Sequence, residues 1–451
     1  MAAVSHQLYV KDRDFTHQIT FSALPLSPLN LNASFHVVAE PGDNSEPNDP
    51  IYTLEKYHLP HHLDPKLSKL VIIDSVKSGK GRTTDGDIYK NSIVPILKII
   101  GLHDKHDYYE TETKDSIHQL ARSLINSEVT PNKDLTVLLL SGDTSIHEFI
   151  NGLPQTSAPR NINLGVIPLG SGNAFALELG VTSAINGVLK VFSDSSGIQK
   201  FPVHQASFSP GSYIQDPEDE EKIDSKSYIS SLKFFVVLSW GLHAAIVGDS
   251  DSLELRKLGN DRFRIAAYNN INSILQNYEG EVVRMVNGVR VNDENQITCH
   301  SYFLLSLVKS LEANFTISPH SDFISGKSYI IDIPFKNLSL SDHSSDSSEK
   351  VNCQLQKQKE FLAGILEKVY VQSSHIDDPD IVYRRVFTES NESLLVFVKD
   401  KEARKRRICV DGRIVILDND GSDTGVHGDQ KYVKIDSFGN KCNGWSLSLI
   451  V

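Results

Sequence analysis

The stretch from Leu135 to Leu153, LTVLLLSGDTSIHEFINGL, constrains the fold of this chain more than any other. An apolar run, 135–140, is followed by the turn Ser141-Gly142-Asp143-Thr144, and Ser145 and Glu148 then have the spacing of a capping box. Apolar residues follow at the i, i+3, i+4 and i+7 positions of one helix face: Ile146, Phe149, Ile150 and Leu153. We therefore predict a buried strand, a tight turn and a helix whose N–H groups point over the turn, where the Asp143 carboxylate is held.

A second copy of this pattern lies about thirty residues further along the chain. The run 164–169, LGVIPL, predicts a buried strand, and Gly170-Ser171-Gly172-Asn173 leads from it into a helix over 174–179. Asn173 is a natural N-cap, and the glycines allow the backbone to approach a ligand closely. One such turn alone is most simply a plain α/β connection, but two in succession favour a phosphate site.

The first buried strand of this half is predicted at 70–73, and the loop 74–82 after it contains lysines and glycines. The pattern GxxxxGK[ST] does not fit this loop, so the loop is not a Walker A loop. Its lysines and backbone N–H groups would still suit a phosphate group, and a solvated basic loop is the alternative. Helical patterns at 89–100 and 113–124 and a strand pattern at 107–110 continue the alternation to about residue 192. We predict a doubly wound parallel α/β sheet, in which ligands bind at the carboxyl ends of strands.

The pattern changes near residue 201 to short β-type runs, interrupted by one helical segment at 246–270. Such runs favour an antiparallel sandwich or barrel. We divide the chain into an accessory N-terminal segment, 1–65, an α/β domain, 66–200, and a β-sandwich domain, 201–451. The last contains an acidic insertion near 210–226 and a serine-rich insertion near 337–359.

The bulk composition excludes several classes of protein. A formal net charge of −12 argues against a general nucleic-acid binder, which needs a basic face. The cysteines, Cys299, Cys353, Cys409 and Cys442, form no CxxC pair, so we expect free thiols in a reducing compartment. No secretory signal and no transmembrane run is visible. We expect a cytoplasmic protein that associates peripherally with intracellular membranes, and a homodimer is compatible with these properties.

Five motifs, in order, resemble those of lipid kinases of the diacylglycerol kinase catalytic-domain superfamily, and most closely those of sphingosine (long-chain-base) kinases. They are SGDTSIHEFINGL (141–153), IPLGSGNAFA (167–176), SWGLHAA (239–245), LRKLGNDRF (255–263) and VDG (410–412). The resemblance, which covers about 70–416, implies an NAD-kinase-like α/β nucleotide-binding domain followed by an antiparallel β-sandwich that binds lipid. It also implies ATP-dependent phosphorylation of a lipid hydroxyl, with Mg²⁺ held chiefly by the nucleotide, so we name no metal-ligating residue.

The resemblance assigns roles residue by residue. Asp143 matches the general base, which takes the proton of the attacking hydroxyl. The residues that match nucleotide contacts are Ser75, Val76, Lys77, Ser78, Gly79, Thr113, Ser141, Gly142, Gly170, Ser171, Gly172, Asn173, Arg256, Arg262, Asp411 and Gly412. Surface salt bridges are the alternative for the two arginines, and a simple hairpin turn is the alternative for Asp411-Gly412. The substrate positions are Asp143, Thr144, Ala245 and Asp249.

Several positions depart from the family pattern. Thr144 replaces a glycine after the catalytic Asp, where φ is expected to be positive, and Ser75-Val76 replaces Asn-Pro. Ala245 stands where sphingosine kinases have the Asp that binds the substrate amine, and Asp249 or Asp251 is the candidate to replace it. Arg413 replaces a glutamate and reverses a charge.

Three hypotheses follow from these residues. The first is a kinase that phosphorylates the primary hydroxyl of a sphingoid long-chain base presented at a membrane surface. The second is a diacylglycerol or ceramide kinase, which needs no acid for an amine and is favoured by Ala245. The third is a catalytically weakened regulatory relative that holds nucleotide or lipid, favoured by Thr144 and Arg413 and opposed by the retained Asp143.

Overall fold

The computed structural model describes residues 4–12, 15–23, 35–41, 52–79, 81–84, 86–123, 133–156, 160–216, 226–259, 261–291, 296–336, 347–389, 391–422 and 428–451. The chain divides into two compact units: unit 1 comprises 1–201 and 440–451, and unit 2 comprises 202–439. Residues 440–451, which we expected in the second domain, therefore belong to the first unit. The predicted insertions lie partly outside the described residues, at 217–225 and 337–346.

The central sheet of unit 1 has the strand order β24-β25-β8-β7-β5-β6, with β9 paired to β25. The neighbouring pairs from β25 to β6 are all parallel. The predicted parallel α/β sheet is present, and its buried strands correspond to the apolar runs of the sequence. Its strands are β5 (Ser68–Asp74), β6 (His106–Glu110), β7 (Asp134–Ser141), β8 (Arg160–Pro168), β9 (Ile198–Lys200), β24 (Lys441–Cys442) and β25 (Trp445–Ile450).

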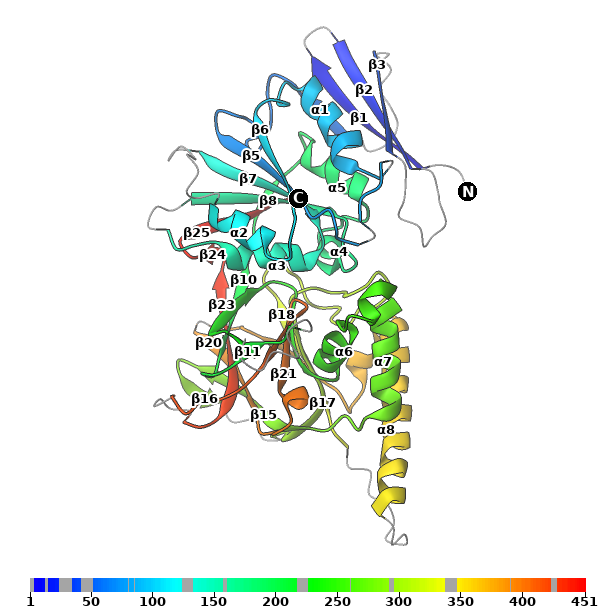
Figure 1. Ribbon diagram of the computed structural model, residues 1–451, viewed down its shortest axis with the longest axis vertical. Helices are drawn as coiled ribbons and strands as arrows, with labels where there is room; N and C mark the ends of the chain where they lie inside the picture. The colour runs from blue at the N-terminus through cyan, green and yellow to red at the C-terminus, as the bar shows by residue number, and fades with distance from the viewer. Residues whose placement is uncertain are drawn as a thin grey trace. The chain divides into compact units, whose positions relative to one another are not determined.

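Helices cover both faces of this sheet (Figure 1). On one face, α1 and α5 pack against Ile72, Leu138 and Leu140 of the strands. On the other side, α2 and α3 lie together, and each buries the apolar face expected from its sequence. The helices are η1 (Tyr89–Ile93), α1 (Val94–Ile99), α2 (Ser116–Ser123), α3 (Asp143–Gly152), α4 (Ala174–Glu178) and α5 (Ala184–Val191). Pro95 lies where the π-helical turn η1 passes directly into α1, at the second residue of α1.

The N-terminal segment forms a four-stranded sheet of order β3-β2-β1-β4. Its strands are β1 (Val4–Asp12), β2 (Phe15–Ala23), β3 (Phe35–Pro41) and β4 (Tyr52–Glu55). Leu8, Val10 and Ile19 are fully buried and share one apolar cluster with α1 and α5. This segment, which we expected to be accessory, is therefore part of the core of unit 1.

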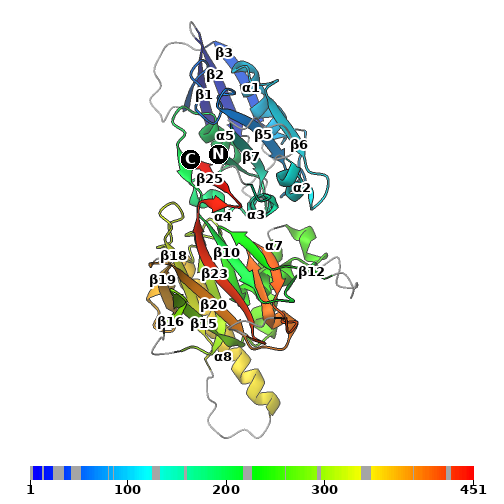
Figure 2. The ribbon, with the colours of Figure 1, turned by 90° about the vertical axis from the view of Figure 1, so that its left-hand side faces the viewer.

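Unit 2 is built on antiparallel strands that form one continuous hydrogen-bonded network, with the path β12-β11-β22-β21-β14-β17-β15-β20-β23-β10-β13 and β16, β18 and β19 paired beside it. Figure 2 shows β10, β20 and β23 side by side in this curled sheet. The strands are β10 (Val203–Phe208), β11 (Tyr213–Ile214), β12 (Ser227–Tyr228), β13 (Ser231–Phe234), β14 (Val237–Gly241), β15 (Tyr278–Val286), β16 (Val289–Val291), β17 (Cys299–Ser306), β18 (Ser328–Pro334), β19 (Val382–Val386), β20 (Glu392–Val398), β21 (Arg407–Val410), β22 (Arg413–Ile416) and β23 (Lys431–Gly439). The result is a mixed α/β chain whose second unit is rich in strands.

The helices of unit 2 differ from the single segment expected at 246–270. They are α6 (Leu242–Ser250), η2 (Leu255–Leu258), α7 (Asp261–Ser273), α8 (Ser347–Tyr370), η3 (Ser374–Asp377) and η4 (Ala403–Arg406). The break after η2 falls at Gly259, whose φ of +59° a helix cannot adopt. Part of the predicted serine-rich insertion, 347–359, is helical in α8. The helix is anchored by buried apolar residues that follow the predicted insertion in the sequence: Leu362, Ile365 and Val369.

Candidate active site

The two glycine turns predicted after β7 and β8 lie against each other. A Cβ on Gly142 would lie 2.7 Å from the carbonyl oxygen of Gly172, and a Cβ on Gly170 would lie 2.3 Å from the Cα of Gly142. The Asp143 N–H donates to the Gly172 carbonyl at 3.2 Å, and the Leu169 N–H donates to the Ser141 carbonyl at 3.0 Å. Close backbone approach therefore explains the glycines at 142 and 170.

The carboxylate of Asp143, half-buried at the start of α3, is oriented by the next helix. Its Oδ2 accepts a hydrogen bond from the Ala174 N–H at 2.7 Å, and its Oδ1 accepts one from the Phe175 N–H at 3.3 Å. Asp143 thus caps α4 from a distance of thirty-one residues along the chain. The amide of Asn173, which we expected to be that cap, instead bonds to the backbone of Gly170.

The start of α3 also differs from the prediction. The helix begins at Asp143 with Gly142 as N-cap, so Ser145 lies inside the first turn and the capping box with Glu148 is wrong. Thr144 is an exposed helical residue, and it is not among the residues with positive φ. The expected backbone strain at Thr144 is therefore absent, because the helix starts before this residue rather than after it.

The loop after β5 comes close to the same corner. A Cβ on Gly79, which has a φ of +63°, would lie 2.6 Å from the carbonyl oxygen of Leu169. The Ser75 N–H donates to the Leu140 carbonyl at 3.1 Å, and the hydroxyls of Ser75 and Ser78 are 2.6 Å apart. The structure therefore brings together three of the predicted loops, 75–79, 141–143 and 170–173, at the carboxyl ends of β5, β7 and β8.

Lys77 connects this loop to the start of α2. Its Nζ donates to the Glu112 carbonyl at 3.0 Å, next to Thr113, whose N–H donates to the Ser116 hydroxyl at 2.9 Å. Val76 lies in the turn that follows β5. Ser171 and Gly172 lie in the bend that precedes α4, where a Cβ on Gly172 would meet open space.

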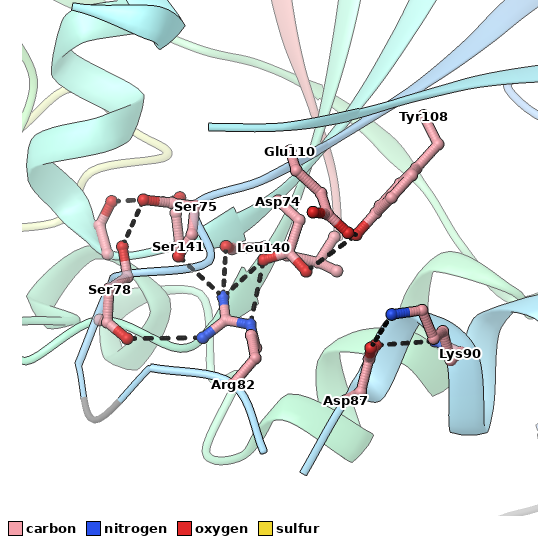
Figure 3. Close-up of polar contacts among 12 residues, drawn as sticks. Asp74, Ser75, Ser78, Arg82, Asp87, Lys90, Tyr108, Glu110, Leu140 and Ser141 are labelled. Atoms are coloured by element: carbon pink, nitrogen blue, oxygen red, sulfur yellow. Dashed lines mark hydrogen bonds and ion pairs between the residues drawn. The ribbon is translucent and has the colours of Figure 1, made fainter. Parts of the chain in front are cut away.

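A buried ion pair that the sequence analysis missed braces the first loop (Figure 3). The Arg82 guanidinium lies 2.7 Å from Oδ1 of Asp74, whose side chain is 1% exposed. It also donates to the carbonyls of Ser75 at 3.1 Å and Leu140 at 3.0 Å. Burial raises the pKa of the Asp74 carboxyl, although the Arg82 charge opposes that shift. An acidic residue at a strand end followed by an arginine in the same loop is the signal that could have indicated this pair.

Tyr108 on β6 completes the surroundings of Asp74. Its hydroxyl lies 3.3 Å from Oδ2 of Asp74 and 3.1 Å from Oε1 of Glu110. Burial and these carboxylates raise the pKa of the Tyr108 phenol, so its hydroxyl keeps its proton. The ring stacks on Tyr89 with centroids 3.6 Å apart, which fixes it against η1.

The predicted arginines of unit 2 are paired with an acid. Arg256 lies 2.9 Å and Arg262 lies 3.3 Å from the carboxylate of Asp251. Asp249, a candidate for binding a substrate amine, accepts hydrogen bonds from Arg404 at 2.9 Å and Arg407 at 2.6 Å. It also accepts one from the Asn270 amide at 2.9 Å, and Ala245 is 1% exposed.

Asp411 lies in the turn between β21 and β22 with a φ of +47°. Its carboxylate accepts hydrogen bonds from the N–H groups of Phe235, Val236 and Val237 at 2.9, 2.9 and 2.8 Å. The side chain is 4% exposed, and these bonds compensate for its burial. Gly412 follows it with a φ of +88°, as a tight hairpin requires.

The geometry of unit 1 fits a phosphate-bearing ligand. Side chains are excluded where Gly142 and Gly170 touch, and the α3 N-terminus adds N–H groups and a positive dipole end. Among the residues that the structure describes, no group of three or more His, Cys, Asp or Glu side chains could hold a metal ion. In the same residues, no helix has the length and apolar character needed to cross a membrane.

Residues 69–203 match the family model of the diacylglycerol kinase catalytic domain. The chain is also similar in fold to a putative diacylglycerol kinase from Bacillus anthracis: the TM-score is 0.50 at 13% identity, over 84% of this chain and 96% of that one. A second diacylglycerol kinase structure from that organism gives a TM-score of 0.48 at 14% identity, with the same coverage. No curated protein matches the sequence. The family match confirms the predicted enzyme class: the chain is a lipid kinase, a phosphotransferase with an alcohol group as acceptor.

Proposed function

We propose that this chain transfers the γ-phosphoryl group of ATP to the primary hydroxyl of a lipid, with Asp143 as the general base. The observation that carries the proposal is the convergence of three glycine-containing loops, one of which holds Asp143, at the carboxyl ends of β5, β7 and β8. Ligands bind at this edge of parallel α/β sheets. An NAD-kinase-like architecture is part of the same proposal.

Asp143 is suited to accept a proton at a fixed position. Two backbone N–H groups of α4 hold its carboxylate, so the side chain needs no reorientation when a hydroxyl arrives. Hydrogen bonds to a carboxylate favour its ionised form, the form that a base requires. As the hydroxyl oxygen bonds to the γ-phosphorus, the bond from that phosphorus to the β–γ bridging oxygen breaks and ADP leaves, and the hydroxyl proton passes to this carboxylate.

The nucleotide contacts are proposed in both units. In unit 1 they are Ser75, Val76, Lys77, Ser78, Gly79, Thr113, Ser141, Gly142, Gly170, Ser171, Gly172 and Asn173. In unit 2, Arg256 and Arg262 would exchange their shared carboxylate partner, Asp251, for phosphate oxygens, which guanidinium groups bind bidentately. Mg²⁺ would neutralise phosphate charge and be held chiefly by the nucleotide, and the match to the VDG motif makes Asp411 and Gly412 further proposed nucleotide contacts.

The acceptor lipid has two candidates. A sphingoid long-chain base is the first, because the SWGLHAA motif resembles that of sphingosine kinases. The second is diacylglycerol or ceramide, whose head carries no amine, and one specific observation favours it. Asp249, a candidate to replace the missing partner of an amine, is bound to Arg404 and Arg407, and Ala245 is buried. An ammonium group would have to displace guanidinium from Asp249.

The experiment offers sphingosine, ceramide and diacylglycerol in mixed micelles to the purified chain with labelled ATP and Mg²⁺. We expect one lipid to be phosphorylated, and Asp143→Asn to lower turnover by about 100-fold or more while ATP affinity changes only a few-fold. Asparagine keeps an oxygen that can cap α4, so the fold should survive. Asp107→Asn, which removes a surface carboxylate from β6, is the matched control.

The outcomes separate the candidates. A phosphorylated sphingoid base supports the first acceptor, and a product from diacylglycerol or ceramide alone supports the second. Nucleotide binding in a calorimeter without any product would refute the proposed transfer and leave a regulatory relative. Full turnover in Asp143→Asn would remove Asp143 from the role of base. Binding of the chain to vesicles of the phosphorylated lipid would test the proposed encounter at a membrane surface.

A further inference from the structure

A surface cavity of about 450 Å³ in unit 2, widely open to solvent, carries an excess of positive charge. Three cationic side chains, Lys309, Lys327 and Arg385, line it together with a single carboxylate, Asp322. His320 and Tyr329 form an aromatic wall, with ring centroids 5.8 Å apart. In a chain whose formal net charge is −12, such a concentration of cations around one hollow is unexpected.

Hydrogen bonds connect the segments that line this cavity. The segment between β17 and β18, residues 307–327, is held by buried hydroxyl groups: Ser321 donates to the Ser306 carbonyl at 3.0 Å, and Ser318 lies 2.7 Å from Ser321. The Tyr383 hydroxyl accepts from the His320 N–H at 3.0 Å. Tyr383 belongs to β19, which lies beside β18 (Figure 2) and places Arg385 opposite Tyr329. The cationic side chains therefore come from segments that are joined to one another by hydrogen bonds.

The one carboxylate in the lining is directed into its own turn. Asp322 accepts a hydrogen bond from the Ser325 N–H at 3.1 Å, and its backbone forms a two-bond bridge with Lys327. Burial opposes its ionisation, but the hydrogen bonds from Ser325 and the charges of Lys309 and Lys327 lower the pKa of the Asp322 carboxyl overall. It therefore stays ionised and neutralises one of the three cations. Within the described ranges, no hydrogen bond or ion pair engages the Arg385 guanidinium.

We infer that this cavity of unit 2 binds a phosphate monoester. Cationic side chains outnumber carboxylates by three to one in the lining, so the cavity attracts the charge of about −1.5 to −2 that a phosphomonoester carries near neutral pH. Arginine offers phosphate a bidentate fork and lysine a point charge, and the Tyr329–His320 wall suits the organic part of the ligand. The source is either the headgroup of a phosphorylated lipid or a soluble phosphate ester. The inference is independent of the reaction proposed above, because none of these residues lies among the proposed catalytic or nucleotide contacts.

The test measures amide hydrogen exchange of residues 309–329 in the full chain, titrated with inorganic phosphate and with glycerol 3-phosphate. Exchange there should slow as phosphate binds. The variant Lys327→Gln with Arg385→Gln should raise the half-saturating concentration by about tenfold or more, the effect of losing charge-assisted hydrogen bonds. Lys357→Gln with Lys359→Gln on α8 makes the same change in net charge away from the cavity and should have no effect. Lys309→Gln provides a second, single-site test if the double variant is unstable.

A vesicle experiment distinguishes the two sources. Stronger binding to phosphatidic acid vesicles than to phosphatidylserine vesicles of equal surface charge, lost in the cavity variant alone, identifies a lipid phosphate. Equal binding to both vesicles, with phosphate protection retained, identifies a soluble ester. Unchanged exchange at 309–329 with every phosphate, or equal weakening by the cavity and α8 variants, would overturn the inference.

Discussion

Replacing Arg82 by glutamine should destabilise unit 1 by several kcal/mol at neutral pH. The guanidinium contacts Asp74 at 2.7 Å and the carbonyls of Ser75 and Leu140 at 3.1 and 3.0 Å, and only 10% of its side chain is exposed. Removing one partner of a buried ion pair leaves an uncompensated charge and costs about 3–5 kcal/mol. Asp74 is the group left behind, at 1% exposure.

The pH dependence follows from the same carboxyl. Its pKa in the folded protein is already above its ordinary value of 3.8, and loss of Arg82, which lowers it, would raise it further. Between the unfolded and folded pKa values the native state binds more protons, so stability falls as pH rises. In Arg82→Gln the penalty should therefore be smallest below about pH 4, grow by up to about 1.4 kcal/mol per pH unit between the unfolded and folded pKa values, and stay constant above the folded pKa.

Urea unfolding followed by tryptophan fluorescence provides the assay. The chain has two tryptophans, so replacing Trp240 of unit 2 by phenylalanine leaves buried Trp445 to report on unit 1. Asp74→Asn in the Arg82→Gln background is the control, because it removes the stranded charge and should recover most of the lost stability at high pH. A loss below about 1 kcal/mol at pH 8, or an equal loss at pH 5 and pH 8, would refute a buried ion pair here.

Three further changes test the corner around Asp143 and the hairpin of unit 2. Gly170→Ala should abolish nucleotide binding in calorimetry, because its Cβ would lie 2.3 Å from the Cα of Gly142, whereas Gly364→Ala on α8, with nothing within 4 Å, should bind normally; equal affinities would show that the two turns can separate. Thr144→Gly should lower the free energy of unfolding by about half a kcal/mol and leave kcat unchanged, since Thr144 is exposed and helical. A higher kcat would mean that the backbone is strained at Thr144 after all. Asp411→Ala should lower the free energy of unfolding of unit 2 by about 3 kcal/mol or more, because three buried N–H groups lose their acceptor. Urea unfolding followed by Trp240 fluorescence measures this loss, and a loss under about 1 kcal/mol would contradict the prediction.

The local patterns of the sequence were sufficient for three central strands of unit 1 and for the turns after them. The apolar runs 70–73, 135–140 and 164–169 all lie within buried parallel strands, and the glycine turns after the last two meet as expected. These features depend on residues close together in the chain. The predicted site residues of unit 2 stay predictions, because their ion pairs and hydrogen bonds do not themselves identify a nucleotide.

Two of the missed features, the cap of α4 and the pairing of β25, depend on partners that are distant in sequence. The α4 cap comes from Asp143 rather than from Asn173, and nothing near residue 174 signals this. The fold of 347–370 depends on apolar residues spaced along a largely polar helix. The pairing of β25 with β8 joins residues almost three hundred positions apart, which no periodicity reveals.

This last pairing has a consequence for biosynthesis. Leu447 and Leu449 of β25 are fully buried between β8 and β9, so the sheet that carries the candidate active site is incomplete without them. A ribosome must translate all of unit 2 before these leucines exist. During that interval the nascent first unit exposes the unpaired edge of β8, which is the state most open to aggregation or to capture by a chaperone.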